Sequence, residues 1–281
     1  MHATISIEAL ESGKHVLTEA RMAMDSDEAE AMFNVSKNYP ELITQIVPAP
    51  HTLPYDKTIK NWVANEMGDL IFFDVKSTTG EFIDYDREIH WRENRDLSGN
   101  NIMHMGIFYE SAMRWLGTAS SVMAVSNVNV KKRHSSETGH LMDISIPDHL
   151  EAIGEMNIGG NFHLSHSTVL GGAEKIEINI YGTNSTLRIS EDPSSKILQS
   201  HNTSKLKMEI LNRNSNKWKE LKPKKSQIGK WRVEEEFINA IKGKEKISHT
   251  TFSDGVKYMQ FADALKISSE SNRKVYLPLS K

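Results

Sequence analysis

The order of short helices and strands constrains this chain most, because that order changes near residue 50. Before the change, apolar residues indicate a helix at 3–10, a strand at 15–18, a helix at 25–35 and a strand at 42–47. Asp25 supplies a capping side chain for the second helix, and Gly13 ends the first one. Strands that alternate with helices in short units are typical of a parallel sheet with crossover helices. The first 50 residues are therefore predicted to form an α/β unit.

Strands dominate the rest of the chain, after Pro48-Ala49-Pro50. The expected elements are helices at 55–65, 102–116, 233–242 and 254–268, and strands at 70–75, 121–130, 150–156, 161–167, 175–181, 186–189, 205–211 and 274–279. Glycine pairs such as Gly159-Gly160 mark tight turns between successive strands. This succession predicts an α+β domain with an open, mostly antiparallel sheet covered by helices on one face. Residues 77–101 are polar and are expected to form a long loop.

Length and composition exclude several classes of protein. A chain of 281 residues is long enough for two domains. Because it contains no cysteine, disulfides, thiolate metal sites and cysteine nucleophiles are excluded, which suits a cytoplasmic location. A net charge of −3 does not favour a nucleic-acid partner. Neither a secretory signal nor an apolar run near the ~20 residues of a membrane span is present.

The first candidate site follows the strand at 15–18, in Thr18-Glu19-Ala20-Arg21. Ligands of open parallel sheets bind beyond the carboxyl ends of the strands. Glu19 and Arg21 occupy that position and could present charge to a cofactor. The alternative is an ordinary surface ion pair between them.

Two further candidates follow along the chain. Trp91-Arg92 joins an indole to a guanidinium and could wall a pocket for a flat ring or a phosphate, or could simply anchor a loop. His104 shares a helix face with Phe108 and Ser111 and could exchange a proton with a substrate hydroxyl. The alternative for His104 is a hydrogen-bonded histidine beneath a domain interface.

Other chemistries lack support in the sequence. The spacing of His163 and His166 is awkward for one face of a strand, and no His-Glu-x-x-His motif occurs, so no metal site is predicted. No Gly-x-Ser-x-Gly elbow indicates a serine hydrolase. The lysine-rich residues 217–225 are predicted to be a solvated edge strand.

Taken in order, these segments resemble the Gfo/Idh/MocA family of NAD(P)-dependent oxidoreductases over essentially the whole chain. The matching segments are 8–19, Trp91-Arg92 with 98–101, Met105-Gly106, 113–117 and 180–187. The resemblance implies that 1–50 is the C-terminal part of a Rossmann-type domain. It also implies that 51–281 is a substrate and oligomerisation domain, with 254–279 packing back on it.

The resemblance further implies hydride transfer between NAD or NADP and an alcohol of a sugar-like or cyclitol-like substrate. Glu19, Ala20, Trp91 and Arg92 would be the cofactor-binding residues. The resemblance also implies a homo-oligomer formed through the open sheet. From net charge and hydropathy, neither a nucleic-acid nor a membrane partner is expected.

Four positions depart from the family's pattern. Ala20 stands where the family has its lysine, and Arg21 stands where it has the following proline. In the family's Asp-x-Gly-x-His pattern, His104 takes the aspartate position and Phe108 the histidine position. We therefore expect His104 to act as the acid/base, with Tyr109 nearby. Arg21 would be the cation beside the reacting oxygen, although a guanidinium is a poor proton donor.

A Gly-x-Gly-x-x-Gly motif, which lets a backbone approach a pyrophosphate, does not occur in the sequence. The chain is therefore expected to be an N-terminally incomplete member that binds the cofactor weakly by itself. The alternative is a non-catalytic binding or oligomerisation module of the same family. Elimination or glycoside cleavage that begins with the same hydride step stays open.

Overall fold

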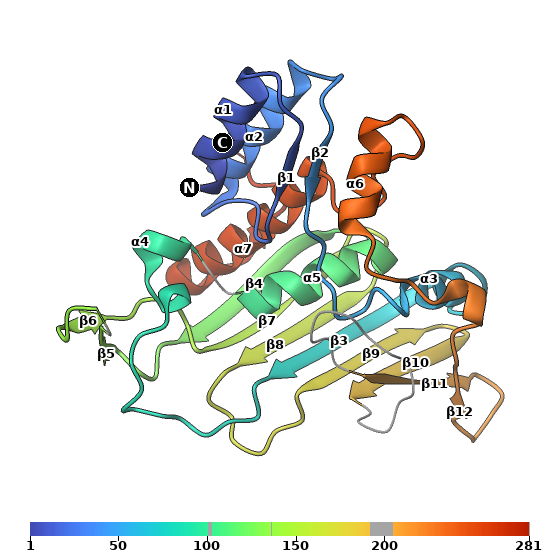
Figure 1. Ribbon diagram of the computed structural model, residues 1–281. Helices are drawn as coiled ribbons and strands as arrows, with labels where there is room; N and C mark the ends of the chain where they lie inside the picture. Colours follow the sequence, from blue (N-terminus) through green and yellow to red (C-terminus); the bar gives the residue numbers. More distant parts are fainter. Residues whose placement is uncertain (101–102, 136, 192–204, 281) are drawn as a thin grey trace.

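The computed structural model describes residues 1–100, 103–135, 137–191 and 205–280, and the side chains of 103–105 lie outside this description. Figure 1 shows three layers: a large sheet, helices across one of its faces, and the N-terminal elements stacked above those helices. In the part of the chain that the structure describes, no helix lies on the opposite face of the sheet. The fold is therefore the mixed α/β architecture expected from the sequence.

The N-terminal elements confirm the predicted alternation of helix and strand. They are α1 (His2–Glu11), β1 (Val16–Thr18), α2 (Ser26–Lys37) and β2 (Thr44–Ile46). Strands β1 and β2 pair in parallel, with Val16 opposite Thr44. The carboxylate of Asp25 accepts a hydrogen bond from the backbone N–H of Glu28 at 2.9 Å, as its capping position predicts.

The large sheet has nine strands in the order β12-β11-β10-β9-β3-β8-β7-β4-β13. Their bounds are β3 (Leu70–Thr78), β4 (Ala119–Asn127), β7 (His149–Met156), β8 (Asn161–Ser167), β9 (Ile176–Gly182), β10 (Ser185–Glu191), β11 (Leu206–Asn212), β12 (Lys219–Glu220) and β13 (Val275–Tyr276). All neighbouring strands are antiparallel except β3 and β8, which run parallel. The predicted mostly antiparallel sheet is confirmed, and the lysine-rich segment contributes its edge strand β12.

The helices of the second region are α3 (Asp56–Asn65), α4 (Arg95–Ser98), α5 (Met103–Leu116), α6 (Val233–Ile241) and α7 (Phe252–Ser271). Two pairs of short elements fall where the sequence predicted only loop. One is the pair of short helices η1 (Trp91–Glu93) and α4 within the polar stretch, which the side chains of His90 and Asn94 cap. The other is the hairpin of β5 (Lys132–His134) and β6 (Leu141–Asp143). Both are too short for hydrophobic periodicity to reveal.

Helix α7 connects the N-terminal elements with the sheet. On one side it packs against α2, and on the other it packs against β4 and α5. The segment before it pairs with β2, because the backbone N–H of Ile46 donates to the carbonyl of Thr250 at 2.9 Å. The C-terminal helix thus covers the sheet, as expected, and also supports the N-terminal elements.

The uncovered face of the sheet carries both polar and apolar side chains. His163 lies between two carboxylates, with its ring nitrogens 2.7 Å from Asp74 and 2.7 Å from Glu151. Beside them Met123, Val125 and Ile153 are 43%, 63% and 55% exposed. Among the described residues, no group of three or more His, Asp and Glu side chains could hold a metal ion.

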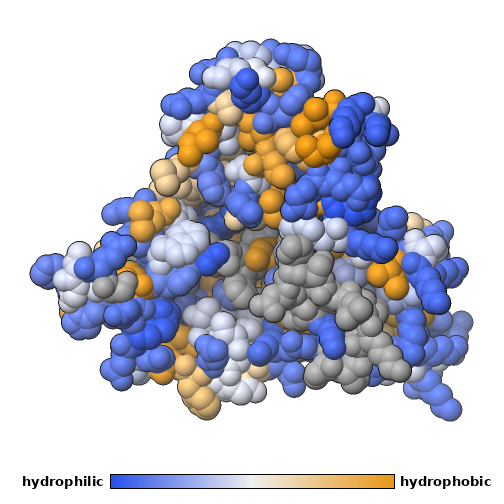
Figure 2. Space-filling model, viewed as in Figure 1, coloured by the Kyte–Doolittle hydropathy of each residue, from blue (hydrophilic) through white to orange (hydrophobic). Residues whose placement is uncertain are grey.

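Figure 2 shows a largely hydrophilic surface on the face that it presents, with apolar atoms gathered on the upper part near the N-terminal elements and α6. In the part of the chain that the structure describes, no helix is long and apolar enough to cross a membrane.

Candidate functional site

The carboxyl end of β1 is open to solvent. Thr18 is buried, whereas Glu19 and Ala20 directly after it are exposed. These two residues stand where the topology of a parallel sheet places a ligand. Two of the four predicted cofactor-binding residues, Glu19 and Ala20, therefore lie at an accessible edge.

Arg21 turns into the interior instead. Its Nη2 donates to the backbone carbonyl of Asn100 at 3.0 Å, and its side chain lies along Gly106, where an added Cβ would come within 3.3 Å of Cδ. Burial lowers the pKa of Arg21 to about 10, against the opposing influence of Tyr258 and Asp263. Arg21 is thus a cation at neutral pH that joins the end of β1 to the start of α5.

Three more contacts fasten the same junction. The backbone N–H of Met22 donates to the Tyr258 hydroxyl at 2.7 Å. Asn100 accepts at its backbone carbonyl from Arg21, and its side chain donates to Asp263 at 3.1 Å. Gly99 has a φ of +62°, and a Cβ there would lie 2.3 Å from the carbonyl of Met24. The glycine is required for this close approach.

Trp91 and Arg92 form a flat surface at the start of the same segment. The Arg92 guanidinium lies 4.4 Å from the centre of the Trp91 ring, and Trp91 is 50% exposed. A hydrogen bond from the Ser98 hydroxyl to the Arg92 carbonyl at 2.9 Å holds Arg92 to α4. An exposed indole with a guanidinium across its face is suited to a planar, negatively charged partner.

A cavity of about 490 Å³ opens beside Arg92, between the loop 79–93 and the ends of β3 and β8. Its apolar walls include Ile144, Ile146 and Val169. Its polar walls include Thr79, Thr168, Asp148 and His166. This size and mixture of walls fit a small organic ligand with several hydroxyl groups.

Of the two residues on α5 that were proposed as acid/base groups, the structure describes the side chain of Tyr109 only. The side chain of His104 lies outside the described residues. Tyr109 is buried, and its hydroxyl accepts a hydrogen bond from the backbone N–H of Ala119 at 2.9 Å. Its ring stacks on Phe261 at 3.6 Å between centroids, and burial raises the pKa of its phenol. Tyr109 thus packs in the core against Phe261 and Ala119. These contacts do not support the predicted role of Tyr109 beside an acid/base residue.

His51 is a residue that sequence reasoning did not single out. It follows β2 in the loop 48–54, and its ring stacks on Phe108 with centroids 5.9 Å apart and planes at 21°. Phe108 is buried, whereas His51 is half-buried. The only signal in the sequence is its position after Pro48-Ala49-Pro50, where the chain leaves the N-terminal elements.

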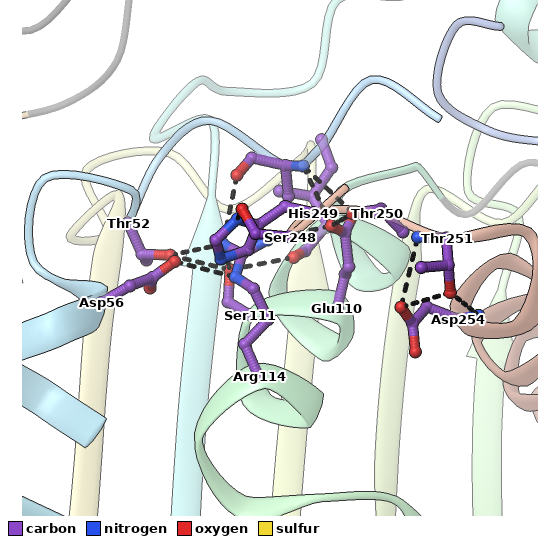
Figure 3. Close-up of polar contacts among 12 residues, drawn as sticks. Thr52, Asp56, Glu110, Ser111, Arg114, Ser248, His249, Thr250, Thr251 and Asp254 are labelled. Atoms are coloured by element: carbon purple, nitrogen blue, oxygen red, sulfur yellow. Dashed lines mark hydrogen bonds and ion pairs between the residues drawn. The ribbon is translucent and has the colours of Figure 1, made fainter. Parts of the chain in front are cut away.

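A buried charge network lies next to this loop (Figure 3). Arg114 pairs with Asp56 at 2.8 Å and with Glu110 at 2.9 Å, and all three side chains are buried. Glu110 also accepts from the Thr250 hydroxyl and from the backbone N–H of Ala49. Burial raises the pKa of the Glu110 carboxyl, while Arg114 acts in the opposite direction.

Comparison of the sequence with models of protein families shows which family the chain belongs to. Residues 60–277 match the Gfo/Idh/MocA model described as "Oxidoreductase family, C-terminal alpha/beta domain". The chain belongs to the Gfo/Idh/MocA family. This membership covers the nine-stranded sheet and the helices above it. A comparison with curated protein sequences finds no match.

Solved structures of similar fold extend the likeness to the N-terminal elements. An NAD-binding oxidoreductase from Klebsiella pneumoniae has a TM-score of 0.81 at 17% identity, covering 99% of this chain and 78% of that chain. A levoglucosan dehydrogenase in complex with NADH and levoglucosan has a TM-score of 0.78 at 17% identity, with coverage of 99% and 77%. The Gal80p super-repressor mutant from Saccharomyces cerevisiae has a TM-score of 0.74 at 14% identity, with coverage of 98% and 77%. At these identities the likeness shows the fold.

Proposed function

We propose that this Gfo/Idh/MocA chain is an oxidoreductase that exchanges a hydride between NAD(P) and an alcohol of a sugar-like or cyclitol-like substrate. One observation carries the proposal most directly. Arg21 and Asn100 hold the exposed end of β1 against the segment 91–100 and the start of α5. A ligand bound at that end meets residues of both parts of the molecule.

Glu19, Ala20, Trp91 and Arg92 would hold the nicotinamide end of the cofactor. Their fit rests on the exposed β1 edge and on the half-exposed indole with its guanidinium 4.4 Å away. The bound cofactor would supply the hydride acceptor or donor. Binding by this chain is expected to be weak, because its sequence has no Gly-x-Gly-x-x-Gly segment for the pyrophosphate.

The substrate class is supported by the cavity beside Arg92. A sugar ring presents apolar C–H faces and polar hydroxyl edges, and the cavity offers walls of both kinds. Dehydrogenases of levoglucosan share the fold. Hydride-initiated elimination or glycoside cleavage on the same substrates would use the same first step.

The chain offers a matched pair of variants for testing the cofactor site. Trp91→Ala removes the indole beside Arg92, whereas Trp218→Ala removes an equivalent indole that lies 4.3 Å from Arg188 at the edge of the sheet. Titration with NADH should show binding weakened about tenfold in Trp91→Ala, and unchanged in Trp218→Ala. Equal binding by the two variants would remove Trp91 from the cofactor site.

A non-catalytic binding or assembly module is the second candidate, and Phe108 favours it. A buried, stacked phenylalanine cannot exchange protons, and it occupies the position that the resemblance assigns to the family's histidine. This candidate predicts that levoglucosan or myo-inositol binds while no reduced nicotinamide forms from NAD⁺ or NADP⁺. The oxidoreductase predicts both binding and reduction.

We also infer a homo-oligomer formed through the uncovered face of the sheet. The exposed side chains of Met123, Val125 and Ile153 gather there on neighbouring strands. Apolar clusters of this kind mark protein interfaces. A cytoplasmic location is proposed as well, since a chain without cysteine fits a reducing compartment.

A further inference from the structure

A cavity of about 420 Å³ lies beside the C-terminal half of α5, where Gly117 and Thr118 form part of its wall. Helix α5 has 14 residues and is therefore roughly 20 Å long, so these two residues lie about that far from the junction at the start of the helix. A second cavity, of about 230 Å³, shares part of this wall. The residues that line both cavities are Lys60, Ser248 and His249.

A chain of hydrogen bonds sets which nitrogen of His249 carries a proton. Both oxygens of the Glu236 carboxylate accept from other donors, Oε1 from the backbone N–H of Ser248 at 3.1 Å and Oε2 from the Gln45 amide at 2.8 Å. The Ser248 hydroxyl also donates to Glu236, so it has no proton left for the imidazole. The 2.8 Å contact between Ser248 Oγ and His249 Nδ1 is therefore donated by Nδ1–H. In the neutral ring, Nε2 is then the acceptor.

The surroundings favour this neutral ring. Burial, together with the charge of Arg114, holds the pKa of His249 below its usual value, while Asp56 acts in the opposite direction. Figure 3 shows Ser248 and His249 beside the Arg114 side chain. None of the residues that the structure describes forms a hydrogen bond with Nε2 of His249. Nε2 can therefore accept a proton from a ligand.

The charged side chains of the larger cavity favour an anion as that ligand. Its acids already have partners, since Glu110 pairs with Arg114 at 2.9 Å, and Asp254 pairs with Lys257 at 3.4 Å and caps α7. Lys60 is exposed and forms no ion pair with any residue of the described chain. A wall with committed carboxylates and an uncommitted ammonium attracts negative charge.

The kind of donor points to phosphate rather than carboxylate. A carboxylate is matched best by the forked N–H groups of a guanidinium. Arg114 spends each of its three nitrogens on the buried network, and Arg232, beside the second cavity, is paired with two glutamates. Lysine remains, and its ammonium binds phosphate as a point charge.

A phosphate group also brings the proton that Nε2 of His249 can accept. The second pKa of a phosphate monoester is about 6, so near neutral pH the group can share one proton with an imidazole. Its other oxygens stay free to accept from Lys60. Sulfate has the same shape as phosphate but has no proton to share at this pH.

We propose that the space between His249 and Lys60 binds a phosphate group, either as the free ion or as the monoester of a small molecule. One proton is shared between Nε2 and a phosphate oxygen, and the Lys60 ammonium donates to another oxygen. Lys57 and Lys230 on the wall of the second cavity would face the rest of an ester. Because none of these residues belongs to the proposed cofactor or substrate sites, the phosphate site does not depend on the oxidoreductase function.

Phosphate and sulfate test the shared proton. Calorimetric titration of the full chain near neutral pH should show inorganic phosphate binding at least about tenfold more tightly than sulfate. The nitrogen resonance of His249 Nε2, assigned by its loss in His249→Phe, should shift on saturation with phosphate. Equal affinities for the two ions, or a resonance that phosphate leaves in place, overturn the proposal.

Two variants test the two side chains separately. Lys60→Met should weaken the binding of both ions about tenfold, and His249→Phe should abolish the preference for phosphate. The matched controls are Lys14→Met and His140→Phe, at exposed positions outside both cavities, and both should bind as the unaltered chain does. Thermal unfolding shows whether each variant folds. Since Lys60 is exposed, Lys60→Met decides even if His249→Phe does not fold, and an unchanged phosphate affinity in Lys60→Met overturns the proposal.

Glucose 6-phosphate distinguishes the two sources of the phosphate group. Tighter binding than inorganic phosphate assigns the site to esters, whereas weaker binding assigns it to the free ion, and both results support the site. If the full chain binds neither probe at millimolar concentration, the phosphate site is overturned. Titration of the same sample with NADH shows separately whether the proposed cofactor site stands.

Discussion

Arg114 carries the largest concentration of buried charge contacts described in this chain. It reaches Asp56, Glu110, Thr52 and the carbonyl of Ala49, which come from three separate segments. Replacing it would leave two carboxylates buried without their cation. The stability of the loop 48–54 and the position of His51 both depend on this one guanidinium.

Arg114→Met should therefore lower the free energy of unfolding by about 3–5 kcal/mol, because the buried charges of Asp56 and Glu110 lose their partner. Urea denaturation at neutral pH measures the change. The control is Arg188→Met, which breaks an exposed pair with Glu209 and should cost less than about 1 kcal/mol. Similar losses in the two variants would contradict the structural role of the network.

The sequence predicted single residues well where a local rule applies to them. Asp25 caps α2, because capping depends on adjacent residues. The rule for strand ends placed Glu19 and Arg21 together after β1, but only Glu19 is exposed there, and Arg21 turns inward to Asn100. The sequence did not predict the network of Arg114, since its partners are far along the chain. His51 was missed for the same reason, because its stacking on Phe108 forms only when the loop reaches α5.

Among the elements, α7 has the widest set of neighbours. It supports α2 and β2 on one side and covers β4 on the other. Tyr258 on this helix accepts the backbone N–H of Met22, directly after Arg21. Helix α7 thus helps to position the end of β1 that the proposed cofactor site uses.

Tyr258→Phe should lower the free energy of unfolding by about 1–3 kcal/mol, because the buried N–H of Met22 loses its acceptor. Tyr276→Phe, at a tyrosine that is 67% exposed on β13, should change it by less than about 0.5 kcal/mol. Chemical denaturation of both variants measures the difference. A Tyr258→Phe variant as stable as Tyr276→Phe would mean that α7 does not hold this loop through the hydroxyl.

Helices and strands of six or more residues were predicted from periodicity, since each buries one face over several turns or pleats. The parallel pairing of β3 with β8 was not predicted. These strands are separated by about 80 residues and by four other strands in the chain. Their pairing is decided by how all the strands assemble.

At the scale of the whole molecule, the uncovered face of the nine-stranded sheet is the proposed contact surface between two copies of the chain. Met123 and Ile153 lie opposite each other on β4 and β7, and Val125 lies two residues further along β4. All three side chains are substantially exposed. Burial of this cluster against a second copy would remove apolar surface from water.

Ile153→Glu should convert the assembly to monomers, because a carboxylate would be buried within the contact. Light scattering during gel filtration measures the mass. Ile158→Glu is the control, since Ile158 is also exposed, at 53%, but lies in the turn after β7. A chain that is monomeric without any substitution, or an Ile153→Glu variant that stays assembled, would contradict the proposed interface.

The most direct test of the central claim is transfer of deuterium from substrate to cofactor. The full chain is incubated with millimolar NAD⁺ or NADP⁺ and with levoglucosan or myo-inositol deuterated at its carbinol carbons, and the nucleotide is analysed by mass spectrometry. Hydride transfer predicts reduced nicotinamide that carries one deuterium, formed only when the protein is present. Absence of deuterated nicotinamide with both cofactors and both substrates would contradict the account and favour the binding module.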